Sequence, residues 1–253
     1  MYCQEFFMPI NSKTKKQVKN KTSDPIRLNH YLAIKNIATR RGADKLIESG
    51  VILVNGKVAT IGMKVTDQDD VKVLKDTTSD YKYIAYHKPV GIVTVGPNPG
   101  ERAIPVKDFG EGMFPIGRLD KDSHGLIIIT NDGRVTGALL DPKKNHDKEY
   151  RITVSKPVTN NLLRGMKEGI RIGAGVNTRR ALVRKVDPTT LEIVLTEGKN
   201  RQIRRMAMAY GFDVSELVRF RIMNIELGNL KPGQHRSIMG AELETFLKQL
   251  GLK

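Results

Sequence analysis

From about residue 26, the apolar positions of the chain predict two short helices followed by a hairpin. The residues at helical spacing are Leu28, Tyr31 and Leu32 in the first helix and Ala43, Leu46 and Ile47 in the second. Thr39 can cap the second helix, and Gly50 ends it. Strands are predicted over residues 51–54, 57–58 and 71–74. Asn55-Gly56 is the preferred two-residue hairpin turn, so residues 25–76 are expected to form a small α/β domain.

From residue 81 the pattern changes to strands that outnumber helices. The expected strands are 83–86, 126–130, 149–154, 181–186, 191–195 and 217–222. The expected helices are 135–140, 159–167 and 200–210. Because the strands recur as hairpins, we expect residues 81–253 to form an α+β domain on a mixed, largely antiparallel sheet. A polar run at 76–80 would link it to the first domain.

The first 24 residues contain no core-forming pattern. Lysines alternate there with Asn, Ser and Thr, which is typical of a mobile basic arm. Such an arm is either a solvated leader or a segment that seeks phosphate.

Charge narrows the class of partner. The 253 residues include 43 Lys and Arg against 27 Asp and Glu, a formal net charge of +16. This balance favours nucleic acid or an anionic membrane surface. No apolar run approaches the roughly 20 residues that a membrane span requires, so RNA or DNA is the better expectation. We expect no secretory signal, and the single cysteine, Cys3, excludes an intramolecular disulfide and fits a reducing cytoplasm.

The best candidate for chemistry is an acid in the loop before the apolar run 126–129. Gly117-Arg118-Leu119-Asp120 places a carboxylate just ahead of a predicted buried strand, where a rigid scaffold can hold it. Taken alone, Asp120 could instead cap a turn or pair with Lys121. In so basic a chain, however, the loop suggests a protein that binds a polyanion and then acts on it.

The predicted helix at 200–210 is amphipathic. Ile203, Met206, Ala207 and Tyr210 fall on one face, and Arg201, Arg204 and Arg205 on the opposite face. The arginine face is either an ordinary solvated surface or a surface that meets the substrate. Gly198-Lys199 before it favours the substrate.

Metal and cofactor chemistry fit the sequence poorly. The five histidines are scattered, there is no cysteine pair, and neither a phosphate-binding Gly-rich loop nor a dinucleotide fingerprint is present. We expect no metal and no cofactor.

The first domain resembles the ribosomal protein S-four-type, or alpha-L, RNA-binding domain. The matching residues are Arg27-Leu28, Ala38-Thr39-Arg40-Arg41, Leu46-Ile47, Gly50 and Val54-Asn55-Gly56-Lys57. The resemblance implies RNA contact, for which the candidates are Arg27, Arg40, Arg41, Asn55 and Lys57.

Four later segments, in order, resemble the RsuA-type pseudouridine synthases of ribosomal RNA. They are Lys88-Pro89-x-Gly91, Gly117-Arg118-Leu119-Asp120 with Ser123, Gly125 and Leu126, Lys148-Glu149-Tyr150, and the run from Gly198 to Met206. With the first domain, the resemblance covers nearly all of residues 26–238. The run 117–126 most resembles the large-subunit synthases designated F.

The resemblance implies a cofactor-free reaction in which uracil leaves its ribose, turns and rejoins through carbon. Asp120 would be the nucleophile, attacking either the sugar carbon or the base ring. Arg204 would pair with it through two parallel hydrogen bonds. Tyr150, otherwise a core-facing strand residue, would stack on the flipped base and move a proton. Arg118 would fill the gap left by the base, and Lys88 would either line the pocket edge, bind phosphate or simply extend to solvent at a strand end.

The last motif and the loop supply further candidates. Those for RNA binding are Lys199, Asn200, Arg201, Gln202 and Arg205. Asp122 is interpreted as a helper of the loop or a solvated acid, not as a second catalytic acid.

We therefore expect an enzyme that isomerises a uridine in large-subunit ribosomal RNA. The alternatives are a synthase for small-subunit rRNA or tRNA, and a non-catalytic RNA-binding protein of ribosome assembly. The presence of Asp120, Tyr150 and Arg204 together argues against the last.

Overall fold

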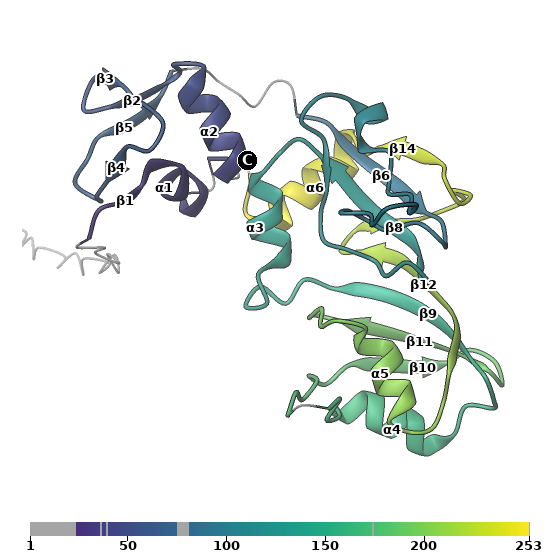
Figure 1. Cartoon of the computed structure of the whole chain (residues 1–253). Helices are drawn as coiled ribbons and strands as arrows, with labels where there is room; N and C mark the ends of the chain where they lie inside the picture. The colour runs from purple at the N-terminus through teal and green to yellow at the C-terminus, as the bar shows by residue number, and fades with distance from the viewer. Residues whose placement is uncertain (1–23, 36, 39, 75–80, 174, 253) are drawn as a thin grey trace, which may run out of the picture.

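The computed structural model describes residues 24–35, 37–38, 40–74, 81–173 and 175–252 (Figure 1). The predicted basic arm, except for Asp24, lies outside these residues, as do Cys3, the proposed cap Thr39 and the predicted linker. Within the described part, no helix is both long enough and apolar enough to traverse a bilayer.

The N-terminal unit has the predicted helix–helix–hairpin order. Its elements are β1 (Ile26–Arg27), α1 (Leu28–Ile34), α2 (Arg40–Glu48), β2 (Ile52–Val54), β3 (Lys57–Val58), β4 (Lys64–Val65) and β5 (Val71–Val73). The two helices bury Leu28, Leu32, Ala43 and Ile47 against the strands, as their spacing predicts. Asn55 and Gly56 both have left-handed φ angles, +52° and +79°, as the tight hairpin turn requires.

The second unit is built on one mixed sheet. Its strands are β6 (Tyr83–Lys88), β7 (Phe114–Pro115), β8 (His124–Thr130), β9 (Lys148–Val154), β10 (Leu182–Lys185), β11 (Thr190–Leu195), β12 (Val214–Ile222), β13 (Ile225–Glu226) and β14 (His235–Ser237). The sheet order is β10-β11-β9-β12-β8-β6-β14, with β13 paired to β12 and β7 to β8. Among the described strand pairs of this sheet, only the central β8–β12 pair is parallel, so the expectation of a mixed, largely antiparallel sheet is confirmed.

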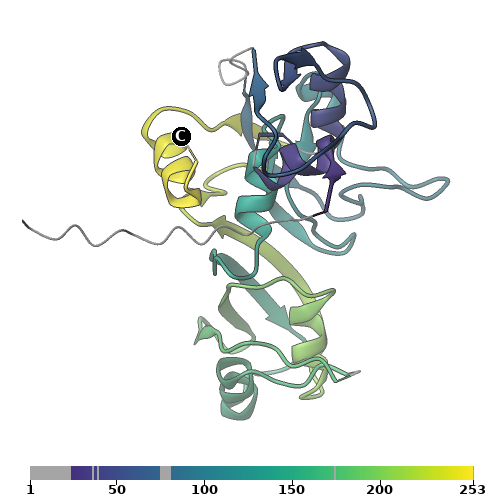
Figure 2. The same ribbon diagram turned by 90° about the vertical axis from the view of Figure 1, so that its left-hand side faces the viewer.

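Helices cover the two halves of the sheet separately. They are α3 (Arg134–Leu140), α4 (Asn160–Glu168), α5 (Gln202–Met208) and α6 (Gly240–Leu250), with a 3-10 turn at Val106–Phe109. Helices α4 and α5 lie at the β10–β9 end, and α3 and α6 at the other (Figures 1 and 2). Two apolar cores result, which meet at the central strands.

Strand β8 belongs to both cores. Ile127 and Ile129 pack in the core that includes α4 and α5, whereas Leu126 and Ile128 pack in the core that includes α3 and α6. A strand covered on both faces has no polar face. This explains why residues 126–129 form a continuous apolar run.

The central parallel pair requires a glycine. Gly125 has φ +114°, and a Cβ there would lie 2.6 Å from the amide nitrogen of Arg219, its partner in register. Any side chain would therefore collide with the backbone of β12. The close approach fixes the loop before β8 against β12, and this is where the candidate site lies.

Candidate active site

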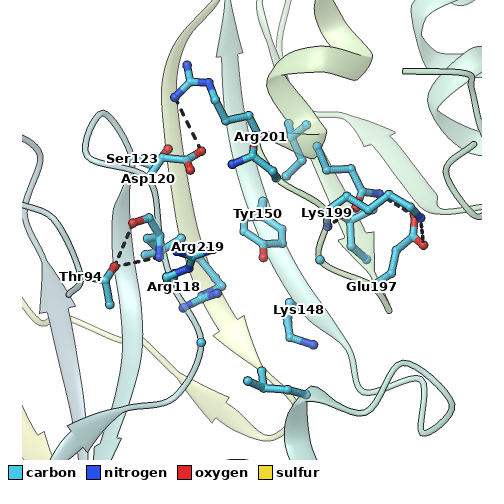
Figure 3. Close-up of a pocket in the computed structure, with 18 of the residues that line it drawn as sticks. Thr94, Arg118, Asp120, Ser123, Lys148, Tyr150, Glu197, Lys199, Arg201 and Arg219 are labelled. Atoms are coloured by element: carbon cyan, nitrogen blue, oxygen red, sulfur yellow. Dashed lines mark hydrogen bonds and ion pairs between the residues drawn. The ribbon is translucent and has the colours of Figure 1, made fainter. Parts of the chain in front are cut away.

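A cavity of about 620 Å³ opens beside the central strands (Figure 3). Its walls are the loop 116–123 that leads into β8 and the loop 195–202 that leads into α5, and its floor includes residues of β9 and β12. The predicted site residues that line it are Arg118, Asp120, Tyr150, Lys199, Asn200, Arg201, Gln202 and Arg204. The fold thus brings together three of the four catalytic-domain motifs.

The loop that carries Asp120 is held by backbone contacts. The Thr94 hydroxyl donates to the Leu119 carbonyl at 2.9 Å and accepts from the Leu119 amide at 3.0 Å. The Ser123 amide donates to the Asp120 carbonyl at 3.1 Å. The Asp120 side chain itself is 32% exposed and lines the cavity. The carboxylate is therefore positioned by its backbone and remains accessible to a ligand.

Arg201 is the arginine nearest to this carboxylate. Its Nη1 lies 3.9 Å from Asp120 Oδ2, and its two terminal nitrogens donate to the two oxygens of Asp122 at 3.1 and 2.9 Å. The hydrogen bond from Arg201 holds the pKa of Asp122 below its usual value. Asp122 thus helps to organise the loop, as interpreted from the sequence.

The predicted Arg204–Asp120 ion pair is wrong. Within the described chain, the carboxylate that pairs with Arg204 is Asp122, whose Oδ2 lies 3.4 Å from Arg204 Nε. Arg204 also donates to the Asp122 carbonyl at 2.8 Å, to Ser123 Oγ at 3.3 Å and to the Val214 carbonyl at 2.7 Å. The reason is where α5 begins. Arg201 has a left-handed φ of +46° and precedes the helix, so it reaches the carboxylates first. Arg204, one turn later, is largely buried and ties the loop to β12.

Lys88 is also not where it was predicted. It is fully buried, and its ammonium donates to the carbonyls of Pro89 and Ile92, both at 2.8 Å. It therefore neither lines the pocket edge nor extends to solvent, and as placed it cannot bind phosphate. Its role in this structure is to brace the turn after β6, beneath the loop of Asp120 and Asp122. Burial lowers the pKa of Lys88 to about 8, against an opposing influence from those two acids.

This buried cation predicts a pH-dependent stability. In the unfolded chain Lys88 titrates near 10.5, and in the folded chain near 8. Between these values the unfolded state binds more protons, so stability should rise with pH, by about 3 kcal/mol in total. Lys88→Met should lack this rise. Denaturant unfolding at pH 7 to 10.5 gives the free energy of unfolding of each protein, and the wild-type value minus the variant value should increase with pH. A difference that stays constant with pH would refute the prediction.

Tyr150 and Arg118 both line the cavity. Tyr150 is 8% exposed and reaches the cavity from β9. Arg118 is exposed at the cavity lining. Lys148 and Arg219 also line the cavity and were missed as site residues. A signal existed for each, since Lys148 lies two positions before Tyr150 on one strand and Arg219 lies among the apolar residues Leu217, Val218 and Phe220.

Glu197 organises the basic loop before α5. This buried carboxylate accepts from the Arg179 amide and from Gln202 Nε2, both at 2.9 Å, and also binds the Lys199 ammonium. Gln202 is consequently buried and turned inward, which contradicts its prediction as an RNA contact. Arg205 is likewise turned toward the protein, donating to the Ile172 carbonyl. The predicted face of three presented arginines is therefore reduced to Arg201, beside the exposed Asn200.

The predicted RNA contacts of the first domain are mostly at the surface. Arg27, Arg40 and Lys57 are exposed. Asn55 is exposed too, but its amide donates to Asp69 at 2.7 Å and accepts from the Asp70 amide at 2.9 Å. Its first role is thus to hold the hairpin turn. The side chain of Arg41 lies outside the described structure. No cluster of His, Cys, Asp and Glu suited to a metal ion occurs in the described ranges.

Comparison with known proteins identifies the family to which the chain belongs. The family model of RNA pseudouridylate synthases matches residues 82–209, which include both cavity loops, 116–123 and 195–202, and α5. The S4 domain model matches residues 26–71. The chain belongs to the RNA pseudouridylate synthase family. It is accordingly an enzyme that isomerises uridine in RNA, with an N-terminal S4 domain.

Individual relatives show which members of the family the chain is similar to. The chain is 42% identical over 230 residues to the dual-specificity RNA pseudouridine synthase RluF of Escherichia coli K12, covering 88% of this chain and 79% of the relative. It is 34% identical to the ribosomal large subunit pseudouridine synthase B of Bacillus subtilis, covering 86% and 94%. A solved pseudouridylate synthase structure aligns with a TM-score of 0.65 at 26% identity, covering 89% and 99%. The chain is thus RluF-like.

Proposed function

We propose that this enzyme converts a uridine of large-subunit ribosomal RNA to pseudouridine, with Asp120 as the catalytic carboxylate. The observation that carries the proposal is the accessible Asp120, held by its backbone at the wall of a cavity within the family's domain. The relative RluF is named as an RNA pseudouridine synthase, and the relative synthase B is named for the large ribosomal subunit, which supports large-subunit rRNA as the substrate.

The cavity suits a base that has left its stack. Such a base needs a ring to lie against and a nucleophile near its glycosidic bond. Tyr150 supplies the ring, and Asp120 the nucleophile, which attacks either the ribose carbon or the uracil ring. Arg201 Nη1, 3.9 Å from Asp120 Oδ2, places a positive charge beside the carboxylate. Exposed Arg118 at the lining can occupy the gap that the base leaves in the RNA.

The first domain binds structured RNA. Its exposed Arg27, Arg40 and Lys57 can contact phosphate without reading sequence. The excess of basic residues over the whole chain supports the same role, since phosphate contacts dominate the affinity of proteins for nucleic acid.

Pseudouridine maps of a strain lacking this gene test the proposal. We expect one modified position of large-subunit rRNA to become uridine and to be restored by the wild-type gene but not by Asp120→Asn. Loss in tRNA as well would extend the substrate range, in line with the dual-specificity name of the E. coli relative. Loss in small-subunit rRNA or in tRNA alone, or an unchanged map, would refute the large-subunit assignment.

A further inference from the structure

The floor of the cavity carries two cations, Lys148 and Arg219, that have no part in the roles proposed for Asp120, Tyr150 and Arg201. Arg219 is 4% exposed, donates through Nε to the Leu126 carbonyl at 2.8 Å, and has a buried Nη2 without any hydrogen-bond partner. Lys148 donates to the His146 carbonyl at 3.0 Å. Neither forms an ion pair with a carboxylate in the described chain. A buried charge on Arg219 and a half-buried charge on Lys148, neither of them in an ion pair within the described chain, indicate a place for an anion.

The sheet register sets these cations beside Tyr150. Arg219 of β12 pairs directly with Tyr150 of β9, and Lys148 lies two positions earlier on β9, on the same face as the tyrosine. All three line the cavity, and Figure 3 shows the hydroxyl end of Tyr150 directed toward the side where Lys148 lies. The cations therefore lie along the ring that the base would contact.

Electrostatics supports their proximity. The pKa of Lys148 is lowered to about 8 by burial first and by the positive charge of Arg219 second, and only Asp147 raises it. Such a pair gains most from a negative charge that enters the cavity between them.

We propose that Lys148 and Arg219 are catalytic residues that bind the carbonyl oxygens of the uracil ring and stabilise the negative charge it acquires during the reaction. This rests on the proposed function, in which Asp120 and Tyr150 receive the flipped base. The ligand is the ring and not a phosphodiester, because a flipped base enters a deep cavity while the RNA backbone stays at its mouth.

The charge arises by either route open to Asp120. If the carboxylate bonds to the ribose carbon, the C1′–N1 bond breaks and its electron pair stays on uracil, spread over its ring nitrogens and carbonyl oxygens. If the carboxylate bonds to C6 of the ring, the displaced pair moves onto C5 and O4, and the C1′–N1 bond breaks afterwards with its electron pair on N1. In both routes C1′ then bonds to C5, the C5 proton leaves while N1 takes up a proton, and Asp120 is released as the carboxylate. The charge is transient, so donors fixed in advance stabilise the transition state more than the bound substrate.

Single-turnover measurements on Lys148→Met, Arg219→Met and Arg219→Lys test the proposal. With enzyme in excess over [5-³H]uridine RNA, each Met variant should slow tritium release about 10²- to 10³-fold. The dissociation constant for RNA should change less than about threefold, and Arg219→Lys should recover part of the rate. Lys143→Met, which removes an equal charge from an exposed position, is the control and should release tritium at the wild-type rate.

The outcomes separate the alternatives. Weaker RNA binding with a normal rate at saturation would show that the cations bind phosphate. Rates equal to that of Lys143→Met would show that the cations do not contribute to the reaction. Either result overturns the proposal. If Arg219→Met does not fold, Lys148→Met and Arg219→Lys decide. The assay uses whichever RNA the wild type turns over, and Asp120→Asn is measured alongside. Failure of the large-subunit assignment or of Asp120 is therefore seen independently of the cations.

Discussion

Asp120→Asn should lower the rate of pseudouridine formation by at least about four orders of magnitude. The amide has nearly the shape of the carboxylate but is a far weaker nucleophile. Stability should hardly change, because the side chain is one-third exposed and its ion-pair contact with Arg201 is long, at 3.9 Å. Affinity for RNA should be kept. The measurement is a nucleoside digest of a single-turnover reaction, in which uridine and pseudouridine are separated and counted.

Asp122→Asn is the matched control for this prediction. It removes an equal charge two residues away. The Asp122 carboxylate accepts a hydrogen bond from Arg201 at 2.9 Å and has no proposed contact with the substrate. The substitution also removes the 3.4 Å ion pair between Arg204 Nε and the Asp122 carboxylate, but the Arg204 contacts to the Asp122 carbonyl and to Ser123 remain, so we expect a loss of roughly tenfold at most. Equal losses in the two variants would mean that the arginine network, and not Asp120, limits the reaction.

Gly125→Ala should prevent stable folding of the catalytic domain or lower its melting temperature by about 10 °C or more. The added Cβ would collide with the backbone of Arg219 in the neighbouring strand, and a paired backbone in a sheet centre cannot move aside as a side chain can. Because the same contact sets the Asp120 loop against Arg219, any folded fraction should also be inactive. Thermal unfolding followed by circular dichroism measures the first effect.

Gly110→Ala separates collision from backbone strain. Gly110 has a comparable φ of +128°, but its nearest neighbour would be a Met113 side-chain carbon at 3.7 Å. Only the cost of an unfavourable φ applies there, about 1–3 kcal/mol. The collision account predicts that Gly125→Ala melts well below Gly110→Ala. Equal melting temperatures would reduce the role of Gly125 to its φ angle alone.

Local patterns predicted most of the elements because each has its own period. The alternation in β9 and the helical spacing in α4 indicate which residues face the core. Helix α6 was not predicted, although Leu243, Phe246, Leu247 and Leu250 have helical spacing. Its apolar face completes the second core beside α3 and β8. The need for a helix to cover that face of the sheet can be recognised only from the assembled sheet.

The site divides in the same way between local and non-local information. Motifs predicted that Asp120 and Tyr150 belong to one site, and both residues line one cavity in the structure. They could not show which arginine reaches Asp120, since that depends on a left-handed residue ahead of α5. Nor could they show that Lys88 is buried. The place of Arg219 opposite Tyr150 follows from strand register, which pairs residues 69 positions apart and has no local signature.

Release of tritium from large-subunit rRNA labelled at uridine C5 tests the central claim most directly. If the purified chain attacks a single uridine through Asp120, wild-type protein in excess should release one tritium per RNA molecule, and Asp120→Asn should release none while binding the RNA equally well. Tight binding without release by the wild type, or equal release by the two proteins, would contradict the account.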